Sequence, residues 1–264
     1  MVTKKVMVDT GLEHTILNVR KIETADLFDA LSKGVADFNA RPTHLLFLCI
    51  IYPVLVVLIG RAFAGSDFLP LLFPIVAGSA LMGPVVSCGM YELSRRRELG
   101  LENQWWHCFD VLRSPSILSI VMMGIILGAI FIAWLVAAQG IYTYYFGEDA
   151  PASLLTFAGQ VFTTPAGWSL IIVGCGVGLG FSVVVLAISV VAIPMLLDHH
   201  VDPLTTIMTS IRSVAANPKT MAIWGLIVAG SLIIGALPLF VGLAVVMPIL
   251  GHATWHLYRK VVGY

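Results

Sequence analysis

Two histidines near the end of the chain have the best spacing for ligand chemistry. His252 and His256 stand four residues apart in GHATWHLYR, so on a helix they share one face. Paired imidazoles at this spacing can ligate a metal ion or haem, which makes both residues candidate cofactor ligands. The segment lacks the glutamate of an HExxH zinc motif, and histidines beside Trp255, Tyr258 and Arg259 are also typical of an anchor among lipid headgroups. We therefore expect contact with lipid or a partner here, and no bound cofactor or metal.

A second polar cluster, YELSRRRELG at residues 91–100, directly follows an apolar stretch. Each arginine at the centre of a membrane helix would cost roughly 2.5 to 3.5 kcal/mol, so the chain must leave the hydrocarbon before this point. Its charged side chains can pair with anionic lipid or with a partner subunit. The candidate contact residues at this level are Glu92, Arg95, Arg96, Arg97, Glu98, His199, His200, Trp255, Tyr258 and Arg259.

Other catalytic patterns are missing from the sequence. It contains no phosphate-binding loop, no nucleophile elbow and no catalytic pair of carboxylates. The apolar stretches contain serine and threonine, but no acid or base in mid-span, which argues against a proton-coupled transporter and against a channel with a charged filter. We therefore expect a protein that is not an enzyme. Its net charge of zero gives no indication of nucleic-acid binding.

The composition places these residues in a membrane protein. Hydrophobic residues make up 58% of the 264 positions and charged residues 11%, with a mean hydropathy of +0.94. Soluble domains have about 25% charged residues. Residues 1–24 contain lysines but no apolar run of the kind found in a cleaved signal peptide, so we expect a polar tail at 1–24 and a single membrane domain at 25–264.

Apolar runs of about 20 residues predict membrane-spanning helices. We expect six of them, at residues 44–61, 68–93, 117–142, 169–197, 220–237 and 239–258. The last two share one long uncharged stretch, which Gly235-Ala-Leu-Pro238 divides. Three short amphipathic stretches, at 25–40, 104–113 and 203–216, are expected to lie in the membrane interface. The predicted fold is an all-α polytopic membrane bundle.

The distribution of basic residues predicts the orientation of this bundle. With six spans, every lysine and arginine except Arg61 falls on one side of the membrane, which is 14 of the 15 in the chain. Positively charged loops stay in the cytoplasm, so we expect both termini to be cytoplasmic.

The order of elements suggests a repeat. Three times an amphipathic helix is followed by a proline-containing break and by a pair of spans, the second of which has a proline shortly before its end. These ends begin at Pro84, Pro194 and Pro248. We predict a three-fold pseudo-repeat whose units share one orientation. A functional surface is expected where the three span ends meet on the cytoplasmic face.

The motifs YELSRRRELG, PILGHATWHLYRK (248–260) and LSKGVADFNARP (31–42) resemble the bacterial inner-membrane family known as domain of unknown function 2189. The resemblance covers most of the chain from about Asp26 onward. It implies a polytopic protein of the bacterial inner membrane, and some members carry the label of a cytochrome c oxidase subunit. The resemblance implies no catalytic residue, because an oxidase catalytic subunit needs a larger set of mid-span histidines than this sequence contains.

Three functions remain open at this point. The leading hypothesis is a non-catalytic accessory or assembly subunit of an inner-membrane complex, respiratory in kind, whose partners are the lipid bilayer and other membrane subunits. The alternative is a stand-alone transporter or binding protein for a small molecule or lipid. The third is a haem-binding membrane protein that uses His252 and His256.

Overall fold

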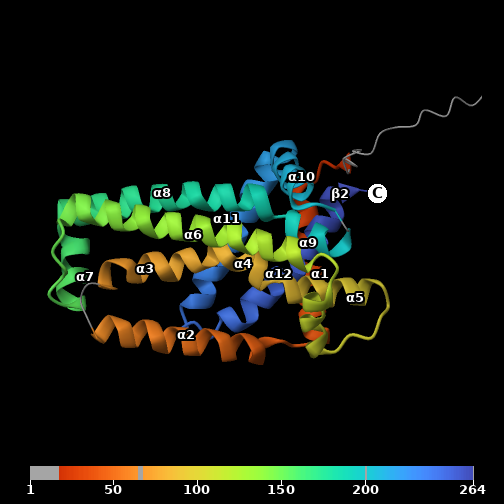
Figure 1. Ribbon diagram of the computed structural model, residues 1–264, viewed down its shortest axis with the longest axis horizontal. Helices are drawn as coiled ribbons and strands as arrows, with labels where there is room; N and C mark the ends of the chain where they lie inside the picture. Colours follow the sequence, from red (N-terminus) through yellow and green to blue (C-terminus); the bar gives the residue numbers. More distant parts are fainter. Residues whose placement is uncertain (1–17, 65–67, 200, 264) are drawn as a thin grey trace, which may run out of the picture.

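The computed structural model describes residues 18–64, 68–199 and 201–263, which form an elongated bundle of helices (Figure 1). Its described strands are β1 (Asn18–Val19) and β2 (Val262–Gly263), which pair antiparallel and join the two ends of the described chain. The helices are α1 (Thr24–Ala40), α2 (His44–Ala64), α3 (Leu69–Gly78), η2 (Ser79–Met82), α4 (Gly83–Val86), α5 (Cys88–Glu98), η3 (Trp105–Arg113), α6 (Ile117–Phe146), α7 (Leu154–Thr163), α8 (Pro165–Ser189), α9 (Ala192–Asp198), α10 (Pro203–Ala216), α11 (Pro218–Ala236) and α12 (Leu243–Val261). The predicted all-α class is confirmed.

Four described segments are long and apolar enough to cross a bilayer: Leu69–Glu98, Ile117–Phe146, Pro165–Asp198 and Pro218–Ala236. A fifth is obtained if α1 and α2 are counted together as one broken span, although they bend by 94° where they meet. We take α2 as the membrane arm of this pair, because α1 is amphipathic and carries several charges. The expected membrane protein is therefore confirmed with four or five candidate spans, and six spans are not confirmed.

The segment Leu69–Glu98 is interrupted in its middle by prolines. Pro74 lies inside α3, and Pro84 occupies the first turn of α4 directly after the tighter helix η2. Proline has no N–H to donate to the preceding turn, so the chain tightens and bends at such positions. Nε1 of Trp134 on α6 donates to the carbonyl oxygen of Pro74 at 2.9 Å and so satisfies one polar group in an apolar environment.

Helices α11 and α12 form a hairpin. Its turn places Leu239 and Phe240 at positive φ angles of 51° and 65°, and a Cβ on Gly242 would lie 2.7 Å from the carbonyl oxygen of Gly235. The hydroxyl of Tyr52, in the first half of α2, donates to the carbonyl of Leu239 over 3.5 Å. Figure 1 shows the turn beside α2 and well short of the bundle end where α7 lies.

Helix α12, which covers most of the predicted span 239–258, is absent from the candidate spans. Its second half carries His252, His256, Arg259 and Lys260, which make it too polar for the hydrocarbon.

Helix α1 packs along α12 through one face. This face consists of Leu27, Ala30, Gly34, Asp37 and Phe38. A Cβ on Gly34 would lie 2.7 Å from the backbone nitrogen of Ala253, so glycine allows the two helices to touch at backbone distance. Leu196, Ala253 and Leu257 are fully buried in the hydrophobic core.

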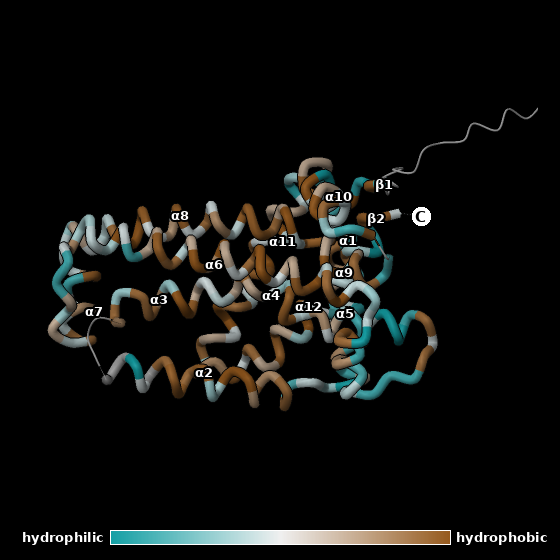
Figure 2. Tube along the Cα trace, viewed as in Figure 1, coloured by the Kyte–Doolittle hydropathy of each residue, from teal (hydrophilic) through white to brown (hydrophobic). Residues whose placement is uncertain are grey.

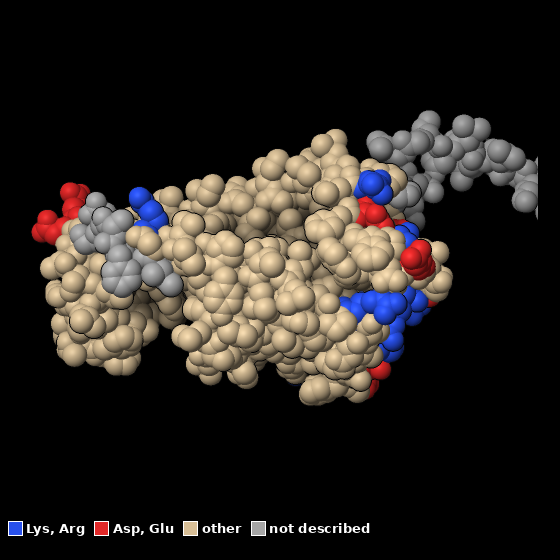
Figure 3. Space-filling model, turned by 90° about the horizontal axis from the view of Figure 1, so that it is seen from below, with Lys and Arg blue, Asp and Glu red and all other residues tan. Residues whose placement is uncertain are grey.

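Polar residues gather at one end of the bundle, which we call the charged end. Figure 2 shows hydrophilic residues around α1, α5 and the β1–β2 pair, and apolar residues along the long helices. Of the lysines and arginines visible in Figure 3, most lie at the same end. Arg61, in the last turn of α2, lies toward the other end.

The three-fold repeat is not confirmed, because the three pairs of helices differ in shape. The first contains the broken segment α3–α5, the second contains the long helix α8, and the third reverses beside α2.

Candidate functional site at the charged end

The ends of α5, α9 and α12 meet at the charged end and are joined by hydrogen-bonded side chains. The hydroxyl of Tyr258 donates to Asp198 at 2.8 Å, so α12 is tied to the end of α9. Arg259 donates to Asp198 through Nη1 and to Glu98 of α5 through Nε, both at 3.0 Å. Nε1 of Trp255 donates to the same Glu98 carboxylate at 2.9 Å. Four side chains on α5 and α12, together with Asp198, therefore fix the geometry of the three ends.

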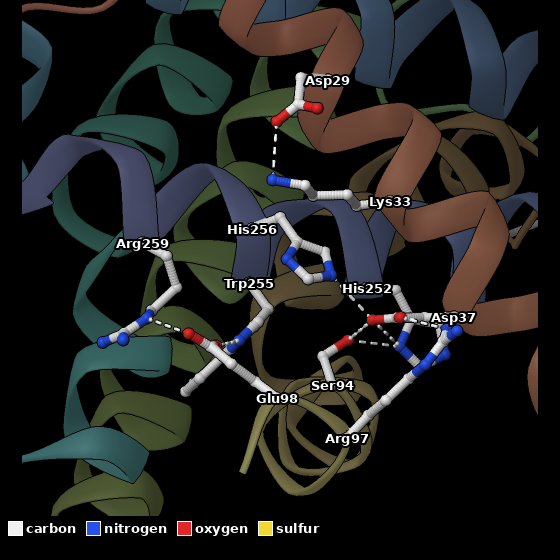
Figure 4. Close-up of polar contacts among 10 residues, drawn as sticks. All are labelled: Asp29, Lys33, Asp37, Ser94, Arg97, Glu98, His252, Trp255, His256 and Arg259. Atoms are coloured by element: carbon white, nitrogen blue, oxygen red, sulfur yellow. Dashed lines mark hydrogen bonds and ion pairs between the residues drawn. The ribbon is translucent and has the colours of Figure 1, made fainter. Parts of the chain in front are cut away.

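Asp37 of α1 is the centre of a second network (Figure 4). Its Oδ2 accepts a hydrogen bond from Ser94 at 2.5 Å and contacts Nε2 of His256 at 2.8 Å. Its Oδ1 accepts from Nη1 of Arg97 at 2.6 Å. The residue is only 8% exposed. Burial alone would raise the pKa of Asp37, but the hydrogen bonds from His256 and Ser94 outweigh it and bring the pKa below its usual value.

His252 lies behind this carboxylate and is 1% exposed. Its Nδ1 lies 2.8 Å from Oγ of Ser94 and 4.0 Å from Oδ2 of Asp37. Because the Ser94 proton is donated to Asp37, Nδ1 of His252 must supply the proton for the bond to Ser94. Nε2 is then a bare acceptor, and it has no hydrogen-bond partner among the described residues. Burial lowers the pKa of His252 to about 4, although the negative charge of Asp37 acts to raise it.

The three arginines of the sequence motif are divided among separate carboxylates. Arg95 pairs with Glu92 at 3.2 Å, Arg96 pairs with Asp110 at 3.1 Å, and Arg97 pairs with Asp37. Glu92 itself is buried. The motif therefore fastens α5 to η3 and α1, and each of its arginines has an acidic partner within the chain.

An open pocket of about 480 Å³ lies between α1, α5 and α12. Asp37, Ser94, Arg97 and His256 contribute to its wall, together with the basic side chain of Lys260. Lys260 also pairs with Asp26 and Asp29 of α1. Hydrogen bonding to Asp26 outweighs burial and raises the pKa of Lys260, so it stays charged and holds the first half of α1 on α12.

The arrangement of serine, histidine and aspartate here differs from a hydrolase triad. In such a triad the histidine lies between the serine and the aspartate and takes the serine proton. Here Ser94 lies between His252 and Asp37, is only 1% exposed and donates its proton to the carboxylate. The described residues also contain no group of three or more side chains suited to holding a metal ion. Both candidate ligands, His252 and His256, direct a ring nitrogen toward the Asp37–Ser94 pair.

The structure brings most of the predicted contact residues together and adds three that the sequence did not indicate. Glu98, Trp255, Tyr258 and Arg259 form one network, while His199 lies 3.7 Å from Asp198. His200 lies outside the described residues. The added residues are Asp37, Ser94 and Asp198.

A signal for Asp37 was present in the sequence. It continues the spacing of Leu27, Ala30 and Gly34 at steps of three, four and three residues, which is the spacing of one helix face. A carboxylate in that series indicates a buried partner of opposite charge elsewhere in the chain.

Residues 72–198 match the family described as "Predicted integral membrane protein (DUF2189)". The match runs from α3 through α9 and includes YELSRRRELG, so the predicted resemblance is confirmed for this part. Asp37, His252 and His256 lie outside the matched residues. No curated protein and no solved structure matches the chain significantly.

Proposed function

We propose that the chain is a non-catalytic accessory or assembly subunit of a complex in the bacterial inner membrane, because residues 72–198 match the DUF2189 family of predicted integral membrane proteins. The charged end would face the cytoplasm, since basic residues are retained on that side. The β1–β2 pair holds both ends of the described chain together, which supports cytoplasmic termini. We favour a respiratory complex, because some members of the family are labelled as oxidase subunits.

The observation that carries this proposal is the exposure of α8. In the most apolar window of Pro165–Asp198 only 6% of the residues are buried inside the chain, against 22% for Ile117–Phe146. On α8, a Cβ added to Gly176 or Gly180 would meet nothing within 4 Å. Small residues let a second membrane helix approach closely, so this face suits a helix of another subunit.

The charged end supports a structural role for the chain. The ionic side chains described above are paired with one another, and the Ser94 hydroxyl is buried and hydrogen-bonded to Asp37. Such a network orients helices, whereas an enzyme needs a reactive group that a substrate can touch.

Purification from native membranes in mild detergent tests the proposal. The tagged wild-type chain should bring down other membrane subunits, and a cytochrome or oxidase among them would support the respiratory assignment. Gly176→Leu together with Gly180→Leu should release these partners without unfolding the chain, since both positions are open. Gly230→Leu is the matched control, because Gly230 of α11 is equally open. A chain that always purifies alone, or a double variant that keeps its partners, would contradict the proposal.

An apolar groove favours a second candidate, a stand-alone protein that binds or transports a lipid or small molecule. Its volume is about 530 Å³, and it lies between α6 and α8. Its walls come from Ala129, Ile130 and Ala133 of α6 and from Val177, Gly180, Phe181 and Val184 of α8. Native mass spectrometry would detect a retained lipid, and a liposome assay would detect flux. Retained lipid without protein partners would favour this candidate.

A further inference from the structure

The imidazole of His252 leaves one nitrogen unsatisfied at a fully enclosed position. Its Nδ1–H is used by Ser94, while Nε2 is a bare acceptor without a partner among the described residues. An unmade hydrogen bond on a buried polar group is a substantial penalty, and native proteins rarely keep one without reason. Nε2 can accept a proton, but burial between packed helices disfavours the charged imidazole that results.

The side chains around His252 also hold α1 in place. Asp37 joins α1 to Ser94 and Arg97 of α5 and to His256 of α12. Figure 4 shows these groups converging on the Asp37 carboxylate from the two neighbouring helices. Ser94 is hydrogen-bonded to both Asp37 and His252, so a movement of Ser94 away from Asp37 also disturbs the enclosure of His252.

We propose that protonation of His252 releases α1 from α5 and α12, so that the charged end is an acid-sensitive latch. In the closed state Nε2 of His252 stays unprotonated. In the open state water reaches His252, and Nε2 binds a proton. The device goes beyond the proposed subunit role and does not depend on it. Its opening widens the pocket between α1, α5 and α12, since Asp37 and Ser94 form part of the wall.

Charged and titratable groups on each neighbouring helix define the surroundings of the latch. Asp37 of α1 and a backbone hydrogen bond at Met90 of α5 favour the proton on His252, while His256 of α12 and Arg97 of α5 oppose it. Arg259 of α12 is engaged by Glu98 of α5 and by Asp198 of α9, farther along α12. The titratable residues of the other helices packed on α12 are His44, Cys49, Tyr52 and Arg61 of α2, Asp198 of α9 and Lys219 of α11, and His199 directly follows α9.

Hydrogen exchange read by mass spectrometry tests the latch in the full chain, held in detergent. Amides of α1 should exchange faster at pH 5.0 than at pH 7.5 after correction for the intrinsic effect of pH. If the open state restores the ordinary proton affinity of His252, the expected acceleration is about 30-fold. Helix α10 is the internal reference, and its amides should exchange more slowly than those of α1 at both pH values.

Two variants distinguish opening of the latch from general acid denaturation. His252→Asn keeps an N–H donor near the position of Nδ1 and cannot titrate, so its α1 exchange should be independent of pH. His199→Asn removes a histidine at the same end and should respond as the wild type does. If the first variant fails to fold, the wild type still decides: α1 opening should rise about sevenfold between pH 6.0 and pH 5.0. A flat wild-type response, or an unchanged response in His252→Asn, would overturn the proposal.

Discussion

The Asp37 carboxylate lies 2.8 Å from Nε2 of His256, although the two residues are 219 positions apart in the chain. This contact joins the first described helix to the last one, and the β1–β2 pair joins the same two regions through the backbone. Together they make the charged end a closed unit built from both ends of the chain. Its stability should therefore depend on single residues that lie far from each other in sequence.

Asp37→Asn should lower the stability of the folded chain by roughly 2 to 4 kcal/mol, because it leaves Arg97 without its carboxylate in a partly buried network. The melting temperature in detergent measures this effect. Asp29→Asn is the matched control, since Asp29 is 45% exposed and its ion pairs should contribute less than about 1 kcal/mol. Equal effects of the two substitutions would argue against a central role for Asp37.

Gly34→Ala should separate α1 from α12. The added methyl group would lie 2.7 Å from the nitrogen of Ala253 and 2.8 Å from the carbonyl oxygen of Ile249, and neither backbone atom can move freely. Overpacking of this kind costs about 1 to 3 kcal/mol, which should appear as a lower melting temperature. Gly128→Ala on α6 serves as control, because nothing lies within 4 Å of the added atom. If Gly34→Ala left the melting temperature unchanged, the two helices would not be held at this distance.

The sequence was informative wherever composition decides the structure. Apolar runs predicted membrane helices, and the arginine motif marked the place where α5 leaves the apolar region. The centre of the site was not predicted, because the role of Asp37 depends on the packing of α1 across α12. Helical periodicity describes one helix at a time, so it places Asp37 on the same face as Gly34 but cannot show which side chains of other helices lie opposite.

The end of the chain shows the same limit. The long uncharged stretch at 220–251 was divided at Gly235-Ala-Leu-Pro238, and the structure turns close to this point. Whether α12 crosses the membrane depends on where its polar second half binds. That half binds α1, α5 and α9 through His256, Arg259 and Tyr258, which are contacts that hydropathy cannot reveal.

Acid should destabilise the folded chain through His252. Its pKa is lowered to about 4 from an ordinary value of 6.5, so between these values the unfolded chain binds a proton that the folded chain excludes. Stability is therefore fully present above pH 6.5 and falls with pH through this window, by up to roughly 1.4 kcal/mol per pH unit. Asp37, whose pKa is lowered as well, adds a further loss only at more acidic pH.

Melting temperatures at pH 7.5, 6.0 and 5.0 measure this dependence. His252→Asn should flatten the profile above pH 5, and His199→Asn should leave it steep. A profile that stays steep in His252→Asn would assign the acid sensitivity to another group.

Arg259→Lys should loosen the junction of α5, α9 and α12. The guanidinium uses Nε for Glu98 and Nη1 for Asp198, and a lysine ammonium lacks the planar fork that reaches both carboxylates. The side chain is 30% exposed, so we expect a moderate loss of about 1 kcal/mol in stability. Arg113→Lys is the control, since Arg113 is 88% exposed and contacts Asp110 at 3.7 Å. Thermal unfolding of both variants in the same detergent gives the comparison. If Arg259→Lys melts at the same temperature as the wild type, Tyr258 and Trp255 hold the junction. Tyr258→Phe should then lower the stability more than Arg259→Lys does.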